Sequence, residues 1–263
     1  MNLETSITDS RFEWPNKVFH FKLDPRFSPT LLNSNVNHVS LANNHIMDFS
    51  SKGMFETMKI LDSLRISHCG CGSNIKEAQR FTTFNIPNSN ITIKCFSAAD
   101  HETLWEASTF KEGIWIIDID NEDYSDVLEI IRNSKKPNDL IIFSCHWGPN
   151  YSWEPSKNIQ KFAHALIDAG VDIIHGHSAH HVQRIEKYQK GIIFYSLGDF
   201  LDDYAIDREY RNDLGCLVEL DYEENKNLKS MKIHPTKISN LHVNLATNPI
   251  EINSVLKIMT RNL

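Results

Sequence analysis

The stretch Asp172-Ile173-Ile174-His175-Gly176-His177-Ser178-Ala179-His180-His181 places four histidines within seven residues, directly after a short apolar run. Residues 171–174 have the length and composition of a buried strand. Clustered imidazoles repel one another when protonated, whereas several neutral imidazoles leaving one strand end can hold a divalent transition metal. Taken alone, the stretch predicts either a metal site or a solvated histidine-rich loop.

The residues before this stretch predict a strand–helix–strand unit. An apolar run at 140–143 is followed by a helix expected over 157–169, which Gly170 ends, and then by the strand at 171–174. These lengths imply parallel strands in a sheet covered on both faces. Further strands are expected over 36–42, 191–197, 216–220 and 228–238, and further helices over 51–65 and 250–259. The sequence therefore predicts a single α/β (or α+β) domain over residues 1–263.

The composition is that of an ordinary soluble protein with a substantial core. The 263 residues are 41% apolar and 23% charged, and the net charge of −7 argues against a nucleic-acid partner. No apolar run reaches the ~18–20 residues of a membrane span, and five cysteines without paired spacing indicate reduced thiols. A cytoplasmic location is therefore expected, while nothing in the sequence indicates the oligomeric state.

Polar residues follow the carboxyl ends of several predicted strands. These residues are Asn44 and His45, His146, His177 and His180, and Asp199. Loops at this edge of an α/β sheet converge on ligands, so the set predicts a metal site. Each member also has a plainer reading: Asn43-Asn44-His45 as a turn, and His146 as a hydrogen-bonded core histidine.

Not every histidine of the cluster can bind the same ion. His177 and His180, three residues apart on an expected loop, can turn toward one centre. His175 and His181 are expected to pack or to orient the ligands. Asp199 could accept hydrogen bonds from loop amides or orient a ligand histidine.

Five segments in this order resemble the CapA-type capsule-synthesis family, which is linked to poly-γ-glutamate production and related to calcineurin-like metallophosphoesterases. The segments are Asn2-Leu3-Glu4-Thr5, Leu41-Ala42-Asn43-Asn44-His45-Ile46-Met47-Asp48, His146-Trp147-Gly148, Gly176-His177-Ser178-Ala179-His180, and Tyr195-Ser196-Leu197-Gly198-Asp199-Phe200. The resemblance implies a metallophosphatase-like layered sheet or sandwich flanked by helices.

The resemblance also implies a set of site residues. The implied metal ligands are Glu4, Asn44, His146, His177 and His180. Apart from the resemblance, Asn43, Asp199 and His175 are expected to support these ligands or to contact substrate. His45 matches the histidine that protonates the leaving group in related phosphoesterases. Family members also carry an upstream strand ending in Gly-Asp, which this sequence lacks. A start placed too late explains this difference best, and an export signal or anchor could lie in the same missing segment.

The leading hypothesis is a metal-dependent hydrolase that uses one or two Mn, Fe or Zn ions to activate water. Its substrate would be a phosphoester or an amide-linked anionic polymer such as poly-γ-glutamate, with His45 as general acid. Two alternatives stay open. One is a non-catalytic capsule-polymer assembly factor on the same scaffold, and the other is a purely structural metalloprotein.

Overall fold

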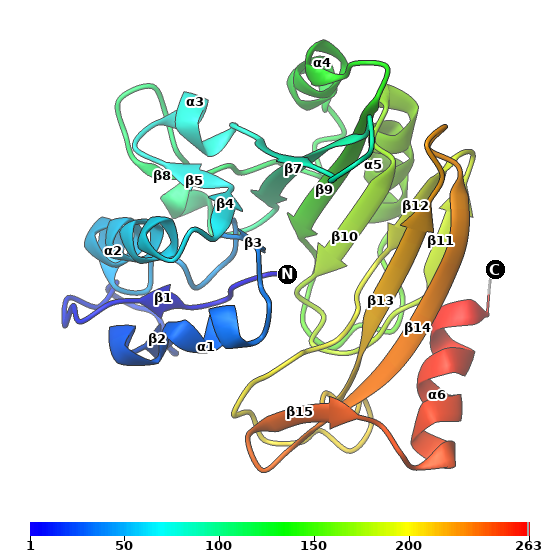
Figure 1. Cartoon of the computed structure of the whole chain (residues 1–263). Coiled ribbons are helices and arrows are strands. Elements are labelled where there is room, and N and C mark those ends of the chain that lie inside the picture. Colours follow the sequence, from blue (N-terminus) through cyan, green and yellow to red (C-terminus); the bar gives the residue numbers. More distant parts are fainter. Residues whose placement is uncertain (262) are drawn as a thin grey trace. The chain divides into compact units, whose positions relative to one another are not determined.

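A computed structural model describes residues 1–261 and 263 (Figure 1). The chain divides into two compact units. The first unit comprises Met1–Thr83, Lys94–Asp118 and Phe143–His146. The second comprises Phe84–Ile93, Ile119–Ile142 and Trp147–Leu263. No helix in this described part of the chain is both long and apolar enough to cross a membrane.

Six strands form a mixed sheet in the order β11-β12-β10-β9-β7-β6. Strand β10 pairs in parallel with β12, and β12 pairs antiparallel with β11. Helices accompany these strands, so the α/β expectation is confirmed. The bounds are β6 Thr82–Asn85, β7 Thr92–Ala99, β9 Asp139–His146, β10 Ile173–His177, β11 Ile185–Tyr188 and β12 Gly191–Phe194.

The first unit is built from short elements around one apolar core. Strand β1 (Ser6–Ile7) lies against helix α2 (Ser50–Ser63), where the Ile7 N–H donates to Thr57 Oγ1 at 2.8 Å. Residues 1–3 run beside β3, because Leu3 N–H donates to the Ser40 carbonyl at 3.0 Å. The other elements are β2 Lys22–Leu23, α1 Pro29–Asn33, β3 His38–Ser40, β4 Ser67–Cys69, β5 Cys71–Gly72, α3 Ile75–Ala78 and β8 Gly113–Ile114, with 3-10 turns at Pro25–Phe27 and Thr103–Trp105.

Helix α5 (Lys157–Ala169) in the second unit begins and ends where the sequence predicts. The Ser156 hydroxyl accepts the Ile159 N–H at its start, and Gly170 at its end has the positive φ of 118° that favours glycine. Its buried residues recur at helical spacing and include Phe162, Ala163 and Leu166. Helix α4 (Ser125–Ser134) precedes it in the same unit.

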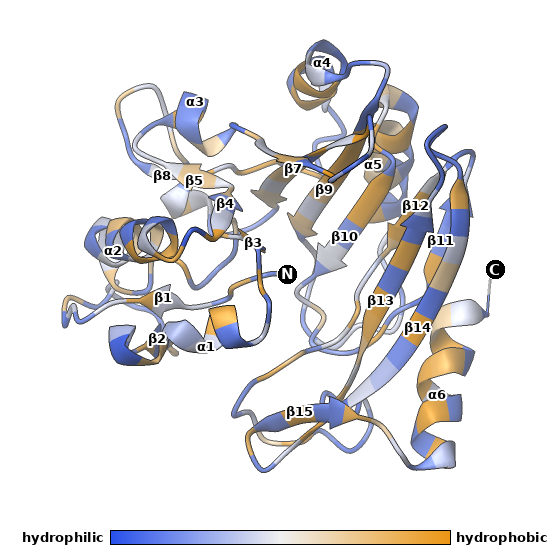
Figure 2. Cartoon of the chain, in the orientation of Figure 1, coloured by the Kyte–Doolittle hydropathy of each residue, from blue (hydrophilic) through white to orange (hydrophobic). Residues whose placement is uncertain are grey.

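A second sheet in this unit is an antiparallel meander of β13 (Leu214–Tyr222), β14 (Leu228–Ser239) and β15 (His242–Leu245). Figure 2 shows alternating colours along β13, as expected for a strand with one buried face. Helix α6 (Pro249–Thr260) buries Val255 and Met259 in the same core as Leu214. The late strands and closing helix expected from the sequence are therefore confirmed.

Two strands extend further than the sequence predicts. Strand β9 continues to His146 and β10 to His177, beyond the expected ends at 143 and 174. In β10 the extension pairs with β12, with His175 opposite Phe194. The expectation that His177 lies on a loop is wrong: it is the last residue of the strand, and its carbonyl accepts the Trp147 N–H at 3.1 Å.

Candidate functional site

Asn43 braces the loop that carries Asn44 and His45 in the first unit. This side chain is fully buried, and its Oδ1 accepts the N–H groups of His45 and Ile46, both at 3.0 Å. Its Nδ2 donates to Asn2 Oδ1 at 3.0 Å and to the Leu3 carbonyl at 2.9 Å. Since all of these bonds are internal, Asn43 fixes the segment before Glu4 against the His45 loop and supports its neighbours.

His45 is held at its Nδ1 by a buried carboxylate. Asp48 Oδ2 lies 2.6 Å from His45 Nδ1, and Phe21 stacks on the imidazole with ring centroids 3.9 Å apart. Asp48 is fully buried and also accepts the Phe21 N–H and the Lys17 ammonium, each at 2.6 Å. With a proton on Nδ1 facing the carboxylate, Nε2 is the nitrogen that can exchange a proton with a ligand.

Glu4 and His146 face each other within the first unit. Asn2 Nδ2 donates to Glu4 Oε2 at 2.9 Å, and the other oxygen, Oε1, lies 3.8 Å from His146 Nε2. That distance is longer than a hydrogen bond. Two ligand atoms that each bind zinc at about 2.0–2.2 Å cannot be more than about 4.4 Å apart, so this spacing fits a shared ion.

Asn44 carries a further candidate ligand oxygen within the first unit. Its Oδ1 is buried and has no hydrogen-bond partner among the described residues, which is costly for an amide unless an unseen group bonds to it. Together, Glu4, Asn44 and His146 are the first-unit group. These nitrogen and oxygen donors suit Mn, Fe or Zn, so the residues fit the implied metal.

Within residues 1–261 and 263, no three His, Cys, Asp or Glu side chains come close enough to form a metal cluster by themselves. In the first unit, Glu4 and His146 are two such side chains, whereas the third candidate ligand, Asn44, is an amide. An ion there therefore depends on the amide oxygen, or on water, for further ligands.

Asp100 and His101 are close to His146, although the sequence did not single them out. They directly follow strand β7, and the Asp100 N–H donates to the His146 carbonyl at 3.0 Å. The His101 and His146 rings have centroids 4.9 Å apart, and Asp100 Oδ1 contacts His101 Nδ1. This pair directly follows the end of a strand, as the other candidate histidines do, so the same pattern could have indicated it.

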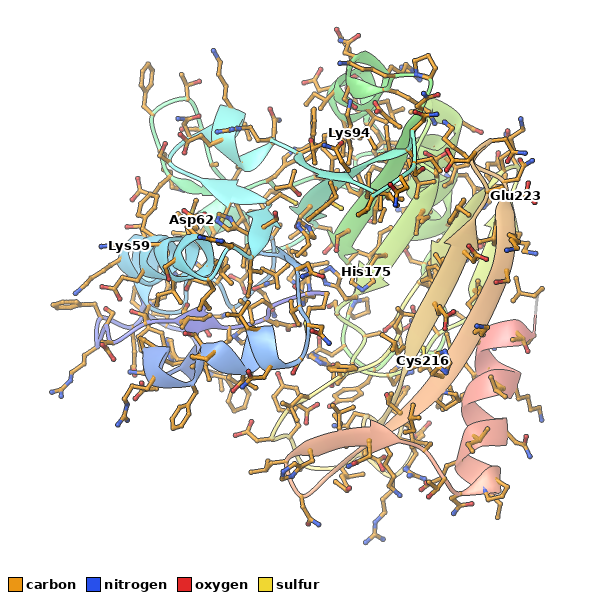
Figure 3. The ribbon with its side chains drawn as sticks, in the orientation of Figure 1. Lys59, Asp62, Lys94, His175, Cys216 and Glu223 are labelled. Carbon is orange, nitrogen blue, oxygen red and sulfur yellow. The ribbon has the colours of Figure 1, made fainter. Side chains whose placement is uncertain are left out.

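In the second unit, His175 (labelled in Figure 3) and His177 lie two residues apart on β10 and therefore share one face. Their ring centroids are 5.2 Å apart. Gly176 between them has no room for a side chain, since a Cβ would lie 2.3 Å from the Tyr195 carbonyl oxygen and 2.6 Å from Trp147 Nε1. The glycine thus allows both histidines to sit on a closely packed strand.

His180 is oriented by Asp199, also within the second unit. His180 Nδ1 lies 3.1 Å from Asp199 Oδ1 and 3.2 Å from Oδ2, and the side chain is almost fully buried. Such a carboxylate fixes the tautomer that leaves Nε2 available to a metal. His177, His180 and Asp199 are the second-unit group. Burial, and then Asp199 itself, raise the pKa of nearby Asp202 to about 7.

His181 is packed among aromatic side chains. It is fully buried, its Nδ1 lies 3.1 Å from the Val182 carbonyl, and its ring lies 4.8 Å from both Trp153 and Tyr210. Burial lowers the pKa of this imidazole, which favours its neutral form.

The first-unit and second-unit groups fall within a stretch that matches a known family. A family model described as "Bacterial capsule synthesis protein PGA_cap" matches residues 1–204. A probable polyglutamine synthesis accessory protein of Mycobacterium tuberculosis is 32% identical over 257 residues, covering 94% of this chain and 67% of that protein.

Two further likenesses concern a longer protein and a solved structure. Capsule biosynthesis protein CapA of Bacillus anthracis is 28% identical over 225 residues, covering 85% of this chain but 53% of that protein, so the chain spans about half its length. The crystal structure of a hypothetical protein from Thermus thermophilus aligns with a TM-score of 0.53 at 11% identity, covering 82% of each chain. That structural likeness concerns the fold alone.

Proposed function

The chain belongs to the bacterial capsule synthesis protein family PGA_cap, and on that basis we propose that it is a metal-dependent hydrolase of capsule or poly-γ-glutamate metabolism. The observation that supports this most strongly is the pair Glu4 Oε1 and His146 Nε2, which are 3.8 Å apart. His146 is fully buried and Glu4 is held by Asn2, so both atoms are fixed in place before any ion binds.

The proposed ligands of one or two divalent ions are those that the family resemblance implies. In the first unit they are Glu4, Asn44 and His146, and in the second unit His177 and His180. Asn43, His175 and Asp199 support them or contact substrate, and the Asp199–His180 distance of 3.1 Å supports an orienting role for Asp199. When bound, such an ion lowers the pKa of water and polarises a phosphoryl or acyl oxygen.

His45 is the proposed general acid. Its Nδ1 is held by Asp48, so Nε2 is the nitrogen placed to donate a proton to the leaving oxygen or nitrogen. Phe21 keeps the ring in one orientation by stacking on it. Asp48 is a positioning residue, because it acts on the substrate only through His45.

The proposed substrate is an amide-linked anionic polymer such as poly-γ-glutamate, or a phosphoester. The first choice follows from the relatives, one called a polyglutamine synthesis accessory protein and the other a capsule biosynthesis protein. Phosphoesters remain in the proposal because the family resemblance includes the calcineurin-like metallophosphoesterases.

A second candidate is a polymer-handling accessory protein without turnover. The observation that favours it is the lack, among residues 1–261 and 263, of any cluster of three His, Cys, Asp or Glu side chains able to hold an ion. This candidate needs no bound metal for its action, whereas the hydrolase does.

Metal removal distinguishes the two candidates. The protein is treated with a chelator, then restored separately with Mn²⁺, Fe²⁺ or Zn²⁺, and assayed on bis(p-nitrophenyl) phosphate and on a γ-linked glutamate oligomer. The hydrolase proposal predicts that cleavage of at least one substrate disappears with the metal and returns with it. Cleavage that is absent at every metal loading, or equal in the chelated protein, rejects the hydrolase.

A further inference from the structure

Lys17 is a charged residue of the first unit that has no role in the mechanism proposed above. Its side chain is only 15% exposed. Its Nζ lies 2.6 Å from Asp48 Oδ1, contacts the Asn44 carbonyl oxygen, and lies 4.6 Å from the centre of the Trp105 ring. Because an ammonium group has three N–H donors, these three partners occupy it fully. Lys17 therefore acts within the protein and not on a substrate.

Asp48 has donors on both of its carboxylate oxygens, and Lys17 is the donor on Oδ1. The other oxygen, Oδ2, accepts the Phe21 N–H and faces His45 Nδ1, both at 2.6 Å. Asp48 is fully buried, so without Lys17 its Oδ1 would be a buried charge without a partner, which is costly. The carboxylate would then turn to share its remaining donors, and His45 would lose a partner of fixed orientation.

The segment that carries Lys17 is fastened to Asp48 at both ends. The Trp14 N–H donates to the Asp48 carbonyl at 2.7 Å, and the Phe21 N–H donates to the Asp48 carboxylate at 2.6 Å. Between these bonds the chain turns at Asn16, whose φ of 60° asparagine adopts more readily than most residues. Both ends and the turn therefore keep Lys17 beside the carboxylate.

We propose that Lys17 is a positioning residue that keeps the His45 imidazole in one orientation by holding the Asp48 carboxylate. Lys17 Nζ is 3.4 Å from His45 Nδ1, and two N–H donors cannot bond to each other, so both groups share the carboxylate and each limits the place of the other. The same ammonium holds the Asn44 carbonyl, next to His45 in the chain. That this orientation serves proton donation rests on the proposed function.

Proton NMR of the whole protein in the presence of Zn²⁺ tests the positioning without a substrate. The Nδ1 proton of His45, bonded to a carboxylate, should give a downfield signal that is absent from His45→Ala. In Lys17→Met this signal is expected to move upfield or to broaden beyond detection, because the carboxylate loses its fixed orientation. Lys17→Arg keeps the charge and should restore part of the signal.

The matched control is Lys22→Met, which removes an exposed lysine from β2. Lys22 also lies over an aromatic ring, 4.6 Å from the centre of Phe49, and its Nζ donates to the Ser10 carbonyl at 3.2 Å. The substitution therefore makes the same change of charge and of aromatic contact without touching Asp48. It should leave the His45 signal as it is in the wild type.

Turnover of a phosphodiester with an alkoxide leaving group is the second readout. Lys17→Met is expected to lower kcat roughly 10- to 100-fold, the range for a lost hydrogen bond to a charged group. KM should change little, since Lys17 does not touch the substrate. In a His45→Ala background the same substitution should have no further effect, because no imidazole is then left to position. The metal content should equal that of the wild type.

An unchanged His45 signal in folded Lys17→Met, or an equal change in Lys22→Met, would overturn the inference. A loss of rate that persists in the His45→Ala background, or a loss of metal, would also overturn it, because Lys17 would then act on the fold or on the ion. If Lys17→Met is unfolded in a circular dichroism melt, Lys17→Gln takes its place: it keeps an N–H donor and should shift the signal in the same direction, and an unchanged signal there rejects the inference.

The two proposals fail in different ways. If the wild type hydrolyses nothing at any metal loading while the His45 signal depends on Lys17, the hydrolase proposal fails and the positioning of His45 by Lys17 holds. Hydrolysis by a protein whose His45 signal is independent of Lys17 has the opposite meaning.

Discussion

Replacing His45 with alanine is expected to slow hydrolysis by about 10²–10⁴-fold, the usual contribution of a general acid. The reason is local, because His45 is the histidine whose Nδ1 is held 2.6 Å from buried Asp48 and whose Nε2 is thereby left to donate. The loop should keep its shape in the variant, since Asn43 Oδ1 accepts the backbone N–H of residue 45, which alanine retains. Turnover of a phosphodiester with an alkoxide leaving group measures the effect, and bis(p-nitrophenyl) phosphate, whose leaving group needs little protonation, should be slowed less.

The metal content of the variant distinguishes loss of the general acid from loss of the metal site. His45→Ala should retain as much bound metal as the wild type, and a substrate with a better leaving group, which needs less protonation, should recover part of the rate. Asp48→Asn should slow the reaction less than His45→Ala, because it removes the partner of His45 and keeps the imidazole. Wild-type turnover in His45→Ala would remove this residue from the mechanism.

Losing a group that only orients a metal ligand lowers metal affinity roughly 10–100-fold. Replacing His146, a proposed ligand, with alanine is expected to lower the metal affinity by more than this. His146 is fully buried and Glu4 Oε1 is 3.8 Å from its Nε2, so the substitution removes one of two facing donors. His180→Ala should have a comparable effect through the second-unit group. Metal content is measured by inductively coupled plasma mass spectrometry after dialysis against a defined free-metal concentration.

The control for both is His164→Ala. His164 lies on helix α5 and is half-exposed, and its Nε2 is 2.6 Å from Glu186 Oε1. This variant should keep wild-type metal content. A circular dichroism melt checks that the buried substitutions remain folded at the assay temperature. Unchanged metal content in folded His146→Ala and His180→Ala would reject the ligand assignment.

The elements that were best predicted from the sequence are those whose ends depend on neighbouring residues. Helix α5 was expected over the residues that form it, because the apolar spacing and Gly170 each act within one or two turns. The ends of β9 and β10 were expected too early, because polar histidines at 146 and 177 end the apolar pattern while the backbone pairing continues. Pairing with a neighbouring strand cannot be read from one segment.

The candidate site was predicted as residue types but not as contacts. Asp48 and His45, which contact each other, are only three residues apart in the sequence. Lys17, which contacts the same carboxylate, is 31 residues from Asp48 in the sequence. The closeness of Glu4 to His146 follows from residues 1–3 running beside β3, which no periodicity indicates.

The central claim is that Glu4 and His146 bind the same ion. A crystal structure of the wild-type protein grown with Zn²⁺, with anomalous data collected at the zinc edge, tests it directly. The predicted result is an anomalous peak about 2.0–2.2 Å from both Glu4 Oε1 and His146 Nε2. A zinc-loaded crystal in which these two atoms bond directly to each other, with every anomalous peak elsewhere, would contradict it.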